Sequence, residues 1–119
     1  MPELREIGSG TVVSLPAGYP ERGRVAAVSG LTDVLALLGR DDLGETFLWV
    51  EEPTVTAVAP VLEEVAGILC TTGGPTAHVA IVARDLGLLC LMRCQVEGVG
   101  EIDGAWLHVD GDGRIAREM

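Results

Sequence analysis

The 119-residue chain contains no lysine, and this absence excludes several chemistries. A Walker-type phosphate-binding loop needs a lysine ammonium group to reach the nucleotide phosphates, and Schiff-base catalysis needs a lysine amine. All eight basic residues are arginines against eighteen acidic residues, the formal net charge is −10, and aromatic residues make up only 3% of the chain. Because nucleic-acid binding depends on positive charge and aromatic stacking, we expect no nucleic-acid partner.

Long apolar stretches and a charged-then-apolar leader are also missing, so we expect neither membrane insertion nor secretion. The odd number of cysteines fits a reducing cytoplasm. Cys70 and Cys90 lie inside apolar runs, where free cysteines usually act as small buried side chains. Together with Cys94 and a histidine they match no common zinc-binding pattern, so no metal site is predicted, and a metal-binding protein is kept only as an alternative.

The length fits one domain that spans residues 1–119 and buries a core without disulfides. Period-two and short apolar runs predict strands, and apolar spacings of three and four predict helices. The predicted strands cover 11–15, 23–29, 47–50, 67–71, 88–92 and a hairpin of 105–110 with 114–117, and the predicted helices cover 31–38, 57–66 and 77–86. This alternation predicts an α/β fold, a mixed sheet with parallel central strands and about three helices.

The most informative segment begins at Gly73 and has the sequence GGPTAHVAIVAR. Gly73 and Gly74 allow a bend that brings bare backbone close to a ligand, and Thr76 is placed to cap the helix that follows. Amides at a helix N-terminus lack partners inside the helix and favour an anion, so we predict phosphate binding at Gly73, Gly74, Thr76 and Ala77. A neutral imidazole nitrogen is a nucleophile toward phosphorus, which makes His78 the candidate catalytic residue.

Three other features have structural interpretations. His108 lies on a strand with alternating polarity, and we expect it to be a solvent-facing structural residue. The run 110–113 (DGDG) lacks the glycine and glutamate positions of an EF-hand loop, so a hairpin turn explains it. Arg84 follows His78 by six helical residues and is turned about 240° from it, so we expect an ion pair or a hydrogen bond to a strand end rather than contact with phosphate.

The segment around His78 resembles the phosphohistidine, or swivelling, domain of the phosphoenolpyruvate-utilising enzymes. In that family a glycine pair, a variable residue, a threonine or serine and one further residue precede the phosphorylated histidine, and a small-apolar helix then ends in Ala-Arg and Leu-Gly. Those residues are present here, and a looser resemblance runs from about Phe47 to Ile115. The chain departs from the family at Leu89, where proline is usual, and at Arg93, where glycine is usual.

The resemblance implies a compact swivelling β/β/α domain whose histidine takes a phosphoryl group at one active site and delivers it at another. It implies no cofactor bound by the chain, a covalent phosphate on His78, and ATP or phosphoenolpyruvate with magnesium on a partner. The expected partner is an ATP-grasp nucleotide-binding protein, a phosphoenolpyruvate- or pyruvate-binding barrel protein, or both. The chain would then be a stand-alone phosphotransferase component, and the alternative is a non-catalytic interaction module with the same fold.

Overall fold

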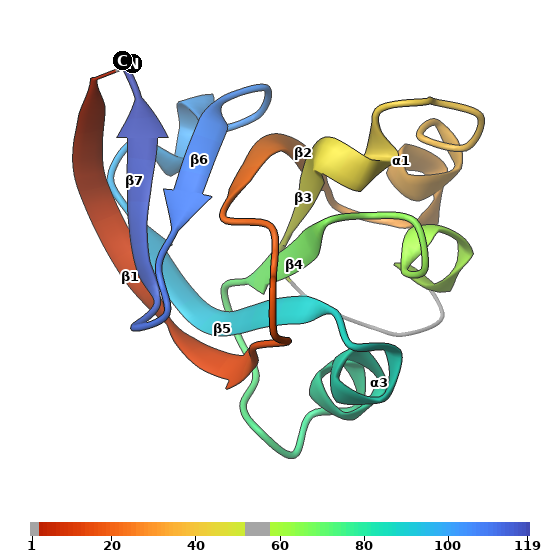
Figure 1. Cartoon of the computed structure of the whole chain (residues 1–119). Helices are drawn as coiled ribbons and strands as arrows, with labels where there is room; N and C mark the ends of the chain where they lie inside the picture. The colour runs from red at the N-terminus through yellow and green to blue at the C-terminus, as the bar shows by residue number, and fades with distance from the viewer. Residues whose placement is uncertain (1–2, 52–57) are drawn as a thin grey trace.

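The computed structural model describes residues 3–51 and 58–119. Seven strands close into a barrel in the spatial order β1-β5-β4-β3-β2-β6-β7, in which β7 also pairs with β1 (Figure 1). The strands are β1 (Leu4–Ser14), β2 (Arg22–Val28), β3 (Thr46–Val50), β4 (Gly67–Cys70), β5 (Leu89–Val96), β6 (Trp106–Val109) and β7 (Arg114–Glu118). The helices are α1 (Leu31–Leu35), α3 (His78–Leu86) and the 3₁₀ helices η1 (Leu43–Glu45), η2 (Ala59–Val61) and η3 (Val99–Glu101).

The prediction of an α/β fold with about three helices is wrong. The strands from β2 to β5 pair in parallel, but β1, β6 and β7 pair antiparallel and close the sheet into a mixed barrel. Only two α-helices, α1 and α3, lie wholly within residues 3–51 and 58–119. In the segment predicted as the helix 57–66, Ala57 lies outside the described residues, Val58 is helical, and the remainder contains η2 and turns. The local pattern of apolar residues does not predict that the barrel closes, because closure depends on pairing between segments that are distant in sequence.

Strands β3 and β4 and the first half of β5 (89–92) are buried on both faces, which explains why they have continuous apolar sequences. In β3, Phe47 and Trp49 belong to the core inside the barrel, while Leu48 and Val50 pack in a second core beneath the helices. Figure 1 shows α1 and α3 on the side of the parallel strands, with β6 and β7 on the other side. Full burial of a side chain such as Phe47 contributes about 1.5–3 kcal/mol. Val79, Ala80 and Ala83 of α3 belong to the second core, which holds the helix against the barrel.

The predicted hairpin at the C-terminal end is confirmed. Strands β6 and β7 pair antiparallel, and the Asp110 carboxylate accepts the backbone N–H groups of Asp112 and Arg114, each at 2.9 Å. An aspartate that accepts backbone amides two and four residues later stabilises a turn. These bonds give Asp110 a structural role in the turn.

The predicted burial of Cys70 and Cys90 is confirmed, and Cys94 is buried as well. The hydrogen bond with Cys90 and burial raise the pKa of the Cys70 thiol, and burial raises the pKa of Cys94 to about 12. No group of three metal-ligating side chains is found within the described ranges. None of the helices described is both long and apolar enough to span a bilayer.

Candidate functional site

His78 is the first residue of α3, directly after the loop of residues 71–77 that leaves β4. We call residues 71–77 the histidine loop. His78 is exposed, whereas Val79 and Ala80 are buried with exposed fractions of 1% and 0%. Packing of these two side chains fixes the start of the helix against the barrel and leaves the histidine at the surface. The predicted position of His78 in the first helical turn is confirmed.

The prediction that Thr76 caps α3 is wrong. The N-cap residue is Ala77, with an extended backbone (φ −61°, ψ 143°), and no side chain caps the helix. The Ile81 amide donates to the Ala77 carbonyl at 3.1 Å, so α3 begins one residue too late for a Thr76 cap. The amides of residues 78–80 therefore have no acceptor within the helix and no side-chain cap, an arrangement that favours a bound anion.

The turn that precedes the helix requires a glycine at position 73. Gly73 has a φ of +104°, which side chains rarely adopt, and a Cβ at this position would lie 2.7 Å from the Met92 sulfur. Gly74 has no positive φ, and its carbonyl accepts the Ala77 amide at 3.0 Å. The sequence thus identifies the glycine turn correctly, while phosphate binding by Gly73, Gly74, Thr76 and Ala77 stays a prediction.

Arg84 holds the histidine loop against β1. One guanidinium nitrogen donates to the Val13 carbonyl at 3.2 Å, and the other donates to the Pro75 carbonyl at 2.7 Å. Because Val13 lies next to the end of β1, the expected hydrogen bond from Arg84 to a strand end is confirmed. The contact with Pro75 was not predicted, and it links the middle of the histidine loop to the helix.

The start of the histidine loop is bound to the end of β3. The hydroxyls of Thr71 and Thr72 both donate to the Glu51 carbonyl at 3.0 Å, and the Thr71 amide donates to the Val50 carbonyl at 3.0 Å. Neighbouring parallel strands end at the same edge of the barrel, which brings these groups together. The sequence offered no signal for these bonds beyond the two threonines themselves.

Arg93 also contacts the histidine loop, and sequence reasoning missed this role. Its Nε donates to the Gly73 carbonyl at 3.0 Å, and its Nη2 lies 3.7 Å from where a Cβ of Gly74 would be. Arg93 has a φ of +56°. A usable signal existed, because arginine stands where glycine is usual in the family that the sequence resembles, and glycine often marks a left-handed backbone.

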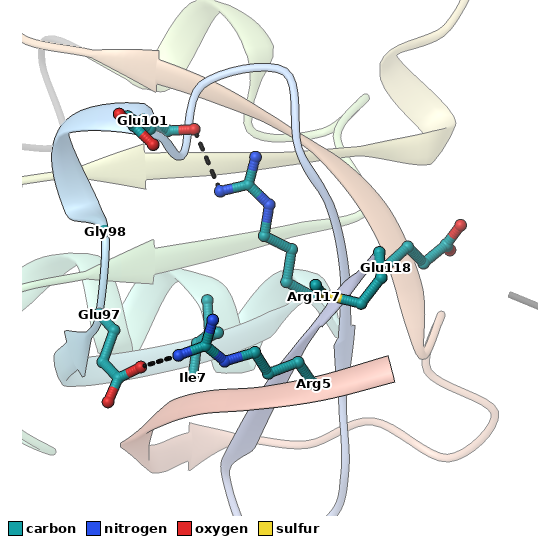
Figure 2. Close-up of a pocket in the computed structure, with 8 residues that line it drawn as sticks. Arg5, Ile7, Glu97, Gly98, Glu101, Arg117 and Glu118 are labelled. Atoms are coloured by element: carbon teal, nitrogen blue, oxygen red, sulfur yellow. Dashed lines mark hydrogen bonds and ion pairs between the residues drawn. The ribbon is translucent and has the colours of Figure 1, made fainter. Parts of the chain in front are cut away.

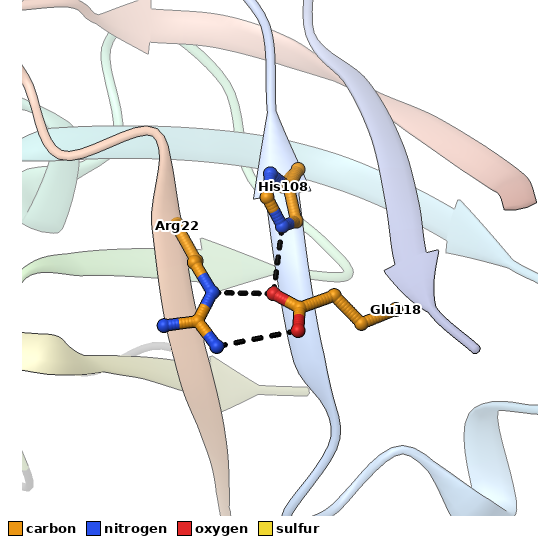
Figure 3. Close-up of polar contacts among 3 residues, drawn as sticks. All are labelled: Arg22, His108 and Glu118. Carbon is orange, nitrogen blue, oxygen red and sulfur yellow. Dashed lines mark hydrogen bonds and ion pairs between the residues drawn. The ribbon is translucent and has the colours of Figure 1, made fainter. Parts of the chain in front are cut away.

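His108 lies away from this loop and has a charged partner. Its Nε2 is 2.7 Å from the Glu118 carboxylate, which also accepts hydrogen bonds from Arg22 (Figure 3). The Arg22 guanidinium, then His108, hold the pKa of Glu118 down to about 2. His108 is half-buried rather than fully solvent-facing, and its contact with Glu118 is consistent with the structural role expected for it.

A cavity of about 480 Å³ lies between β1, β7 and the segment after β5 (Figure 2). Arg5 in its wall pairs with Glu97 at 2.9 Å, and Arg117 donates to the Glu101 carbonyl at 3.3 Å. Figure 1 shows this end, near both chain termini, opposite the histidine loop. The structure therefore does not bring the cavity together with His78, and one of its charged pairs, Arg5 with Glu97, lies within the wall.

A sequence model of the phosphoenolpyruvate-utilising enzyme mobile domain matches residues 46–114, which include the whole histidine loop and His78. The chain belongs to this family. The mobile domain is 32% identical over 91 residues to chondramide synthase cmdD of Chondromyces crocatus, a match that covers 76% of the chain and 2% of that protein. It is 28% identical over 89 residues to the phosphoenolpyruvate synthase of Pyrococcus furiosus, which covers 75% of the chain and 10% of that protein.

Among solved structures, the mobile domain is similar to the N-terminal domain of Enzyme 1 - Nitrogen, with a TM-score of 0.54. The sequence identity is 18%, and the match covers 74% of this chain and 37% of the other. At this identity the likeness shows the fold alone. The mobile domain thus spans a tenth or less of the two relatives' length and just over a third of that structure.

Proposed function

We propose that this mobile domain is a phosphoryl carrier in which His78 is transiently phosphorylated. The observation that carries the proposal is the exposed His78 at a helix start whose amides lack a side-chain cap. Family membership supports the same chemistry, and one relative is a phosphoenolpyruvate synthase. The second histidine, His108, is a weaker candidate because it is half-buried and already paired with Glu118.

In the proposed transfer, an imidazole nitrogen of His78 attacks the phosphorus of the donor and forms an N–P bond. The P–O bond of the donor breaks, and its electron pair leaves on the departing oxygen. An acceptor oxygen later attacks the phosphorus, and the N–P electron pair returns to the imidazole. The open amides of residues 78–80 would stabilise the phosphoryl oxygens, and two transfers replace one difficult displacement.

We further propose that the donor site is on a partner polypeptide that binds ATP or phosphoenolpyruvate with magnesium. An ATP-grasp protein, a phosphoenolpyruvate- or pyruvate-binding barrel protein, or both would supply these sites. The carrier itself would bind no cofactor and would hold only the covalent phosphate. Its three buried thiols fit a reducing cytoplasmic environment.

The proposal is tested first by chemical phosphorylation with potassium phosphoramidate, a small donor that needs no partner. Intact-mass spectrometry at neutral-to-alkaline pH should detect one added phosphoryl group that is lost in acid. His78→Asn should abolish the adduct, and the matched control His108→Asn should retain it. An adduct that survives in His78→Asn would refute the assignment.

The second test incubates the chain with a partner and either ATP or phosphoenolpyruvate. Transfer to His78 at a rate far above that with phosphoramidate supports the carrier function. A partner that is active on its own and binds the chain without phosphorylating it would instead support a non-catalytic interaction module.

A further inference from the structure

Arg93 has an unusual backbone conformation for its residue type. Among the residues that the structure describes, it is the only non-glycine residue with a positive φ, +56°. In this left-handed region the Cβ of an L-residue crowds the backbone, which makes the conformation unfavourable for a long side chain such as that of arginine. Such backbone strain persists only where surrounding contacts maintain it, and it occurs preferentially at functional sites.

The strain occurs at a bulge between β1 and β5. Ser9 pairs with Gln95 and Thr11 pairs with Met92, so the single residue Gly10 lies opposite two residues, Arg93 and Cys94. A bulge inserts an extra residue into one strand and can redirect its side chain. Met92 before the bulge and Cys94 within it are both buried, whereas Arg93 is exposed. The bulge therefore moves Arg93 out of the alternating core pattern.

The redirected guanidinium contacts the glycine turn of the histidine loop. Arg93 Nε donates to the Gly73 carbonyl at 3.0 Å, and Nη2 lies 3.7 Å from where a Cβ of Gly74 would be. The preceding residue, Met92, contacts the same turn, because its sulfur would be 2.7 Å from a Cβ of Gly73. Two consecutive residues of β5 thus define the position of the turn, and the Gly74 carbonyl binds the N-cap amide of α3.

We propose that Arg93 is a positioning residue for phosphoryl transfer at His78, a role that rests on the proposed carrier function. By holding the Gly73 carbonyl, its guanidinium fixes the turn that sets the orientation of the open amides at the start of α3. A histidine and amides held in one arrangement react faster than the same groups in a mobile loop. Arg93 acts through the loop and does not itself take part in the chemistry.

The test uses two variants that separate loop positioning from stability. Arg93→Gly removes the guanidinium and relieves the left-handed strain, so its thermal midpoint should equal or exceed that of the wild type. Arg93→Gln removes the guanidinium but keeps the strain, so its midpoint should fall. Both variants should be phosphorylated at His78 by potassium phosphoramidate about tenfold more slowly than the wild type. The control Arg5→Gln, at the opposite end of the barrel, removes one positive charge and should keep the wild-type rate.

The proposal would be overturned if the phosphorylation rate followed the thermal midpoints, with slow phosphorylation in Arg93→Gln and a wild-type rate in Arg93→Gly. A wild-type rate in both variants would also overturn it. Amide hydrogen exchange on the unphosphorylated proteins gives an independent measurement, and residues 76–80 should exchange faster in both variants. Unchanged exchange there would also overturn the proposal. If the wild type is phosphorylated elsewhere than at His78, the carrier assignment itself fails, whereas wild-type rates in the variants refute only the role of Arg93.

Discussion

Replacement of Gly73 by alanine tests whether the glycine turn is as tightly constrained as the structure indicates. The new side chain would have to adopt a φ near +104°, and its Cβ would lie 2.7 Å from the Met92 sulfur. Carbon contacts are favourable at about 3.5–4.0 Å, so the sulfur or the turn must move by about 1 Å. Met92 is fully buried in the core beneath the helices, which leaves little space for such a movement.

The backbone strain at position 73 and the clash with Met92 each have an expected cost. A left-handed backbone costs a non-glycine residue about 1–2 kcal/mol, and forcing an additional group into a packed core costs about 1–3 kcal/mol. Gly73→Ala should therefore lower the free energy of unfolding by about 2–5 kcal/mol, measured by urea denaturation followed by circular dichroism. Since the domain is expected to have a total stability of about 5–15 kcal/mol, this loss is easily measured.

Gly39→Ala is the matched control. Gly39 also has a positive φ, +87°, but a Cβ there would meet no atom within 4 Å. The control should lose only the backbone term of about 1–2 kcal/mol. A cost for Gly73→Ala no larger than that of Gly39→Ala would refute the packing argument. In a double-mutant cycle, Gly73→Ala should lower the free energy of unfolding by about 1–3 kcal/mol less in a Met92→Ala background than in the wild type, because the clash with the Met92 side chain is then absent.

Three further outcomes are expected. Arg84→Ala removes two hydrogen bonds to backbone carbonyls and should lower the free energy of unfolding by about 1–3 kcal/mol in thermal denaturation, with only partial recovery in Arg84→Lys. The hydrogen bond from Arg22 lowers the pKa of Glu118 to about 2, so the stability that its ionised form contributes is complete above its unfolded pKa and is lost as the pH falls toward 2. Urea midpoints should consequently fall less steeply between pH 5 and pH 2 in Glu118→Gln than in the wild type. Cys70 and Cys94 have raised pKa values and are buried, so a thiol reagent at pH 8 should label them only when urea unfolds the chain.

The sequence predicted those parts of the site that depend on neighbouring residues. The position of His78, the glycine turn and the helix that ends at Gly87 are consequences of local backbone preferences, and the structure has all three. The cap was predicted wrongly because threonine is a better N-cap residue than alanine, so Thr76 was preferred to Ala77. In the structure, packing of Val79 and Ala80 determines where the helix begins, and Ala77 is the N-cap. Local preference was overridden by tertiary contact at that one residue.

The remaining contacts of the site could not be predicted, because they join segments that are distant in sequence. The Gly73 carbonyl binds Arg93 twenty residues later, and the Thr71 hydroxyl binds the carbonyl of Glu51 twenty residues earlier. Barrel closure has the same origin, since β1 pairs with both β5 and β7 near the end of the chain. Individual strands such as 47–50 were found from their apolar runs, but no local pattern specifies that the first and last strands are neighbours.

The distribution of charge gives the histidine loop a distinct electrostatic environment. Although the chain has eighteen acidic residues, the segment 65–96 contains only one, Asp85, together with Arg84 and Arg93. Both arginines donate to carbonyls of the histidine loop, so two positive charges contact the loop that precedes α3 in a molecule of net negative charge. A phosphoryl group on His78 would carry negative charge, and this local arrangement offsets the repulsion from the rest of the chain within a Debye length of about 10 Å. The two side chains that hold the loop thus also make its surroundings less negative, which the proposed carrier function would require.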